Sequence, residues 1–218
     1  MRSILAILAF CCLATQAAAC ETALVLAVDV SGSIDAQEYQ LETGGLAAAL
    51  DDPSIAAALV ADQDAVAVVL WSGVGVQYLA QPWQRMESRA DVARFADGVR
   101  AAARPQGYND TAIGDAILYS IRLFGAVPDC RRTVIDISGD GIENATNTLE
   151  DDRAKAEAEG VTINAIAIEA GSSAAYLAPY FRYAVITADG FVITAKGLPD
   201  YPRAIHDKLL RELTKPAS

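Results

Sequence analysis

Four short runs of mostly aliphatic residues constrain the fold of this chain more than any other feature. They occupy residues 23–28, 64–71, 133–137 and 161–168. Such near-continuous apolar runs are typical of strands that are buried on both faces of a parallel sheet. Between them lie segments with the length and apolar spacing of helices, at residues 35–50, 88–103, 112–124 and 149–159. The alternation predicts an α/β fold with a mainly parallel sheet and helices on both of its faces.

The other elements are shorter. Ser72-Gly73 predicts a turn, and 74–79 then predicts a short strand that pairs back as one antiparallel edge. A short helix is expected over 176–183, a last strand over 191–194 and a closing helix over 201–213.

The first residues have the order of features of a secretory signal peptide. A basic start is followed by an apolar core over 4–14 and by the small residues Ala17-Ala18-Ala19. We therefore predict a signal peptide over 1–19, a folded domain over 20–213 and a C-terminal tail over 214–218. No later segment has the length and hydropathy of a transmembrane helix, so the mature chain is expected to be exported to the periplasm or the extracellular space.

Cys20 and Cys130 are the two cysteines that remain after this cleavage. Each precedes an apolar strand by a similar distance, so the two lie side by side if these strands are parallel neighbours. We predict a Cys20–Cys130 disulfide, as expected for a cysteine pair in an oxidising compartment. The alternative is that Cys20 is a lipidated N-terminal cysteine, although Ala17 is an unusual residue for a lipoprotein cleavage box.

The charge of the chain excludes several classes of function. It contains 17 Lys and Arg against 28 Asp and Glu, for a formal net charge of -11. Nucleic acids and anionic membrane surfaces require basic patches and are therefore not expected as partners. A single histidine also excludes a zinc site built from several histidines.

Oxygen-bearing side chains follow the predicted strands. Asp29, Ser31 and Ser33 come at the end of the first strand, Thr111 precedes a helix, and Asp140 follows the third apolar run. In an open α/β sheet, functional groups gather at the carboxyl ends of the strands. Carboxylate and hydroxyl oxygens are ligands for a hard cation, whereas helix capping and turn formation are the structural alternatives. Asp35 already has the position of a helix N-cap, which favours the metal interpretation for Asp29, Ser31 and Ser33.

These three loops resemble the von Willebrand factor A (VWA) family and its metal-ion-dependent adhesion site. The family motif Asp-x-Ser-x-Ser is matched by residues 29–33, its threonine by Thr111 and its later aspartate by Asp140, within Gly-Asp-Gly where most members have Thr-Asp-Gly. More narrowly, the chain is similar to bacterial secreted VWA-like proteins of unknown function. The resemblance implies a Rossmann-like, doubly wound sheet.

The resemblance also implies a function. Asp29, Ser31, Ser33, Thr111 and Asp140 would bind Mg²⁺, or else Mn²⁺ or Ca²⁺, and would leave one position for a carboxylate of a protein partner. The oligomeric state and the partner's identity are not encoded in these motifs. The alternative function is a metal-dependent phosphatase or phosphoacceptor, which usually needs a second acid two residues after the first and a nearby lysine. Ser31 stands at that second position, so we expect a binding domain rather than an enzyme.

Overall fold

The computed structural model describes residues 20–105, 109–171 and 174–213. Its core is a six-stranded sheet with the order β3-β2-β1-β4-β5-β6. All neighbouring strands are parallel except β3, which is antiparallel to β2. The predicted α/β class and the single antiparallel edge are therefore confirmed. The strands are β1 (Thr22–Asp29), β2 (Ala65–Trp71), β3 (Gln77–Arg85), β4 (Arg132–Gly139), β5 (Val161–Ile168) and β6 (Val192–Ala195).

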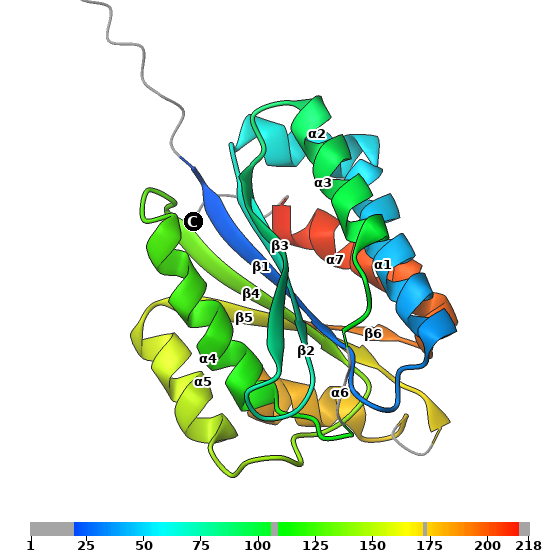
Figure 1. The fold of residues 1–218 in the computed structure, drawn as a ribbon. Coiled ribbons are helices and arrows are strands. Elements are labelled where there is room, and N and C mark those ends of the chain that lie inside the picture. Colours follow the sequence, from blue (N-terminus) through cyan, green and yellow to red (C-terminus); the bar gives the residue numbers. More distant parts are fainter. Residues whose placement is uncertain (1–19, 106–108, 172–173, 214–218) are drawn as a thin grey trace, which may run out of the picture.

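Helices cover both faces of this sheet (Figure 1). Each face has its own apolar core, which explains why the central strands are apolar at almost every position. One face is covered by α1 (Ala36–Asp51), α2 (Pro53–Ala61), α3 (Arg89–Ala101) and α7 (Tyr201–Leu213), and the other by α4 (Ile113–Leu123), α5 (Leu149–Ala158) and α6 (Leu177–Tyr180).

Helix α1 begins with the capping box that its sequence predicts. The Asp35 carboxylate accepts hydrogen bonds from the backbone N–H groups of Gln37 and Glu38, and the Glu38 carboxylate accepts one from the N–H of Asp35. Further along, a Cβ on Gly45 would lie 3.0 Å from Cγ of Pro202 on α7. The absence of a side chain at this position thus lets α1 and α7 approach closely.

The predicted edge strand at 74–79 is wrong in its bounds. Residues 72–76 form the turn, closed by a hydrogen bond from the Ser72 N–H to the Val76 carbonyl, and β3 continues to Arg85. Its second half contains Pro82 and polar residues, which argue against a central strand. An edge strand tolerates them, because its outer backbone groups have no ladder partner. The pairing with β2 also shifts register on either side of Val68, as at a β-bulge.

The predicted helix at 176–183 is also only partly correct. Helix α6 is a single turn, and it continues as a π-helix over Phe181–Val185. Such segments are uncommon and frequently occur at functional sites.

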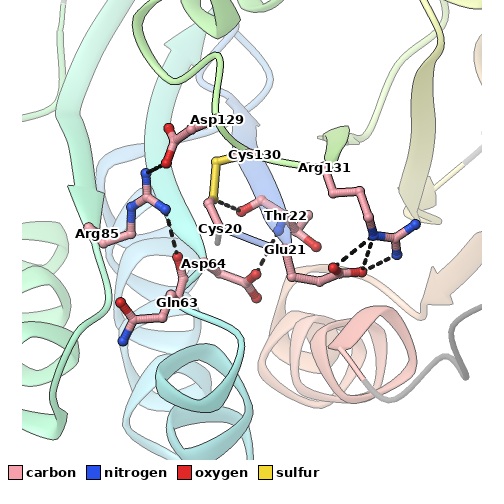
Figure 2. Close-up of a disulfide and its surroundings, with 9 residues drawn as sticks. All are labelled: Cys20, Glu21, Thr22, Gln63, Asp64, Arg85, Asp129, Cys130 and Arg131. Atoms are coloured by element: carbon pink, nitrogen blue, oxygen red, sulfur yellow. Dashed lines mark hydrogen bonds and ion pairs between the residues drawn. A yellow bond between two sulfur atoms is a disulfide. The ribbon is translucent and has the colours of Figure 1, made fainter. Parts of the chain in front are cut away.

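The predicted disulfide between Cys20 and Cys130 is present, with the two Cα atoms 4.3 Å apart. Figure 2 shows the bond at the amino ends of β1 and β4. The register pairs Thr22 with Arg132, so each cysteine precedes a paired residue by two positions. An ion pair between Glu21 and Arg131 lies beside the bond. Because the Sγ of Cys20 is used in this bond, the structure is incompatible with lipidation of that atom.

The predicted signal peptide, 1–19, and the predicted tail, 214–218, lie outside the described residues. Within the described part of the chain, no single helix is long and apolar enough to cross a membrane. Helices α1 and α2 reach that length and composition only as a pair, with a bend of 66° between them.

Candidate metal site

The three predicted ligand loops meet at the carboxyl ends of β1, β2 and β4. Asp29 is the last residue of β1, and Asp140 directly follows the neighbouring strand β4. Thr111 lies two residues before α4 and is held near β2 by a 2.8 Å hydrogen bond from the Ala112 N–H to the Ser72 carbonyl. The fold thus delivers all five predicted residues to one edge of the sheet.

A chain of hydrogen bonds joins the first loop to the third. The Asp29 Oδ1 accepts the backbone N–H of Ser31 at 2.8 Å, and the Ser31 and Ser33 hydroxyls are 3.3 Å apart. The Ser33 hydroxyl then donates to Oδ1 of Asp140 at 2.8 Å. Close polar contacts therefore link these four residues in series.

The second oxygen of Asp29 lacks a partner. Its Oδ2 is buried and has no hydrogen bond within the described part of the molecule. Burial raises the pKa of Asp29 to about 7, and the negative charge of Asp140 adds to this effect, while the Ser31 N–H opposes it. Burial also raises the pKa of Asp140. Two acids that are costly to ionise side by side favour a bound cation, which would neutralise both.

Two glycines leave room around these oxygens. A Cβ on Gly139 would lie 3.1 Å from Oδ2 of Asp29, and one on Gly141 would lie 3.3 Å from Oγ1 of Thr111. Both distances are shorter than an ordinary van der Waals contact. The Gly-Asp-Gly sequence therefore keeps side chains away from the atoms that face the site, and it places Thr111 beside the loop that carries Asp140.

Asn144 holds Thr111 in place, a role that the sequence interpretation missed. The Asn144 Oδ1 accepts the backbone N–H of Thr111 at 2.8 Å, and the Asn144 N–H donates to the Thr111 carbonyl at 3.1 Å. This reciprocal pair fixes the backbone of the second loop to the third. In the sequence, Asn144 begins an Asn-Ala-Thr sequon, which gives no indication of this contact.

Glu143 secures the same junction. Its carboxylate accepts three backbone N–H groups, each at 3.0 Å, from Gly114, Ala145 and Thr146. Helix α4 has no side-chain N-cap of its own, so Glu143 satisfies one of its free N–H groups from another loop. The only sequence signal is a polar pair, Glu143-Asn144, soon after Gly-Asp-Gly. Its importance depends on which loops meet in space.

Glu42 is a third acid near the site and was also missed. It projects from α1 into the protein interior, and neither of its carboxylate oxygens has a partner among the described residues. Burial raises the pKa of Glu42 well above its ordinary value, and the charges of Asp29 and Asp140 raise it further. Burial and the two neighbouring acids therefore all disfavour the ionised form of Glu42.

The residues present fit a hard cation. Across the described residues there is no group of three or more His, Cys, Asp or Glu side chains placed to hold a metal. The assembled donors are instead two carboxylates and three hydroxyls: Asp29, Asp140, Ser31, Ser33 and Thr111. Such an all-oxygen set suits Mg²⁺, Mn²⁺ or Ca²⁺, and the buried, unpartnered Oδ2 of Asp29 is the atom that most needs a positive charge.

Comparison with known protein families and structures supports this fold. A family described as "Protein of unknown function (DUF1194)" matches residues 19–217. A comparison with curated proteins found no match.

Several solved structures share the fold. Proximal thread matrix protein 1 from the mussel byssus, with a zinc-occupied MIDAS motif, has a TM-score of 0.66 and 22% identity over 89% of this chain. A von Willebrand factor type A structure from Catenulispora acidiphila has a TM-score of 0.61 and 18% identity over 89% of this chain. The pilus adhesin SpaC from Lactobacillus rhamnosus GG has a TM-score of 0.65 and 12% identity over 88%.

This chain spans only part of each of these proteins: 48% of the byssus protein, 42% of the Catenulispora protein and 31% of SpaC. At these identities the likeness establishes the VWA fold.

Proposed function

We propose that this chain, which belongs to the DUF1194 family of proteins of unknown function, is an exported VWA-fold binding domain. Its site holds a divalent cation and uses it to recognise an acidic group on a protein partner. The observation that carries the proposal is the buried, unpartnered Oδ2 of Asp29, which lies beside a second acid and a series of hydroxyls.

The ion would be held by Asp29, Ser31, Ser33, Thr111 and Asp140. Three of these five ligands are neutral hydroxyls, so the two carboxylates at most balance a divalent charge. Mg²⁺ prefers six oxygen ligands, which leaves one position for an oxygen from outside the chain. A bound cation would supply an electrophilic position there, and a carboxylate is the protein side chain best suited to it.

Export is part of the proposal. A disulfide joins Cys20 to Cys130, and disulfides persist in oxidising compartments such as the periplasm and the extracellular space. The similar structures come from a pilus adhesin and a byssus matrix protein. The predicted signal peptide over 1–19 points to the same location.

The residues around the site do not favour the enzymatic alternative. A phosphatase or phosphoacceptor of this kind would need a second acid where Ser31 stands and a lysine to hold phosphate. Lys208, the buried lysine, forms an ion pair with Asp136 instead. His206, the single histidine, lies on α7 near Asp52 and Asp207.

A carboxylate-displacement experiment tests the proposed function. Mn²⁺ is added to the protein, and water proton relaxation reports the water molecules that remain on the bound ion. Glutarate should lower the relaxation enhancement, because its carboxylate replaces a coordinated water, whereas the diamide of glutarate should not. Asp29→Ala should abolish the enhancement itself.

The proposal fails if Mn²⁺ gives no enhancement with the wild-type protein, or if glutarate and its diamide have equal effects. Turnover of a phosphate ester that requires Asp29 would instead establish the enzymatic alternative.

A further inference from the structure

A cavity lies beside the β4–α5 loop, which also carries Asp140. Its volume is about 520 Å³, within the range of small-molecule sites. It is lined by the β4–α5 loop, by α5 and by the segment from Tyr180 to Ala184, which includes most of the π-helix. None of the five candidate metal ligands lines this cavity, and the residue that it shares with the surroundings of the metal site is Glu143.

Arg153 of α5 is one of two positively charged residues that line this cavity. Its Nη1 donates to the Tyr183 carbonyl at 2.9 Å. Its Nε is buried and makes no hydrogen bond to any described residue. Because protein atoms enclose Nε, an anionic oxygen in the cavity would meet the guanidinium of Arg153 through its outer nitrogens. Arg182, which is exposed, lines the same cavity and adds a second positive charge.

The acids of the cavity limit the charge of the ligand. The carboxylate of Glu143 is already occupied by three backbone N–H groups, and Glu150 is exposed at the start of α5. Both glutamates still repel anions. A ligand with a single negative charge, such as a carboxylate, therefore suits the two arginines better than a doubly charged phosphate.

The remaining walls favour an aromatic body on that carboxylate. Tyr180 and Tyr183 line the cavity together with Leu149. Tyr183 is 85% exposed, so its ring is accessible to a flat ligand that stacks on it. Tyr180 is fixed, because its hydroxyl accepts the Glu143 N–H at 3.2 Å.

We propose that the cavity between α5 and the π-helix binds a small aromatic carboxylate. The carboxylate pairs with Arg153 and Arg182, and the aromatic body lies against Tyr183 and Leu149. This site uses none of the five candidate cation ligands, and it goes beyond the proposed recognition of an acidic protein partner.

The test uses 2-naphthoate as the probe and the whole exported chain in excess chelator, so that no metal can hold the carboxylate. Ligand-observed NMR titration measures its dissociation constant. Arg153→Met and Arg182→Met should each raise this constant about tenfold or more, the loss expected for one charge-assisted hydrogen bond. Arg94→Met is the matched control, because Arg94 lies on α3 at the other face of the sheet with its side chain 65% exposed. It should leave binding unchanged.

Two isosteres test the ligand class. Uncharged 2-naphthamide and doubly charged 2-naphthyl phosphate should both bind more weakly than 2-naphthoate. Arg182→Met decides the result if Arg153→Met loosens the π-helix, because Arg182 is on the surface.

The proposal is overturned if 2-naphthoate does not bind, if either isostere binds as tightly, or if Arg182→Met has no effect. Failure of 2-naphthoate to bind would leave the proposed cation site intact. Failure of the cation site would leave the binding of 2-naphthoate in chelator unchanged.

Discussion

At the scale of single residues, Asp29 has the surroundings that most strongly favour a cation. It is fully buried, one of its oxygens has no hydrogen-bond partner among the described residues, and Asp140 is close. An aspartate in such a place costs free energy when it ionises, unless a positive charge arrives with it. Its stabilising effect should therefore depend on both pH and metal.

The pH dependence has a definite sign. An unfolded aspartate has a pKa of about 3.9. Burial raises the pKa of Asp29 to about 7 in the folded protein. The folded state therefore holds a proton that the unfolded state has lost, and the metal-free protein should lose stability as pH rises from about 4 to about 7.

In chelator, the free energy of unfolding should fall between pH 5 and pH 7.5 by roughly 2 kcal/mol more in the wild type than in Asp29→Asn. Urea unfolding at both pH values measures this difference. Asp64, whose pKa burial also raises to about 7, is present in both proteins and does not affect it. Equal losses in the two proteins would contradict this account of Asp29.

Ser33 allows a second prediction at this scale. It is exposed, so Ser33→Asp should fold although it loses the hydrogen bond to Asp140. The added carboxylate would over-neutralise a divalent ion and weaken its attraction for an outside carboxylate. Mn²⁺ should still bind, while displacement of its water by glutarate should need roughly ten times more glutarate. Ser33→Ala is the control for loss of the hydroxyl, and unchanged displacement by glutarate in Ser33→Asp would contradict the charge argument.

At the scale of elements, much of the site follows from strand order. Apolar runs predicted β1, β2, β4 and β5, and the carboxyl-end rule then predicted that Asp29, Thr111 and Asp140 would meet. The parts that could not be predicted depend on contacts between loops: Glu143 and Asn144 matter because the third loop packs against Thr111. The length of β3 was missed because an edge strand carries no continuous apolar signal.

The loop contact gives a prediction of its own. Asn144→Ala removes the acceptor for the Thr111 N–H and should weaken Mn²⁺ binding by about tenfold, roughly the worth of one buried hydrogen bond. Asn144→Asp keeps an acceptor oxygen and should restore much of the affinity. Metal titration measures both, and melting in chelator separates loss of binding from loss of folding. Wild-type affinity in Asn144→Ala would contradict the role given to this contact.

Helix α7 is joined to the sheet by a buried ion pair between Lys208 and Asp136. Burial already raises the pKa of Asp136 to about 6, despite the lysine. Lys208→Met should lower the free energy of unfolding by about 3–5 kcal/mol, because it leaves a buried acid without its partner.

Adding Asp136→Leu to this variant should recover part of the loss, and Lys155→Met on the exposed face of α5 should change little. Chemical denaturation compares the four proteins. A Lys208→Met variant as stable as wild type would show that the pair does not hold α7.

At the scale of the whole molecule, the disulfide joins the two strands that deliver the acids of the site. Cys20 and Cys130 are 110 residues apart in sequence, and their pairing was predictable because both precede neighbouring parallel strands. Replacing both by serine should lower the free energy of unfolding by about 2–5 kcal/mol, since a cross-link over a long loop restricts the unfolded chain. The metal response should persist in this variant, because the site lies at the opposite ends of the strands. Its loss in a folded variant would contradict that separation.

The most direct test of the cation site is thermal melting with Mg²⁺ or Mn²⁺ and with chelator, on wild type and Asp29→Ala. The wild type should melt at a higher temperature with metal than with chelator, because the ion binds only the folded site. Asp29→Ala should melt cooperatively in chelator and show no response to metal. An equal melting temperature of the wild type with metal and with chelator would contradict the cation site.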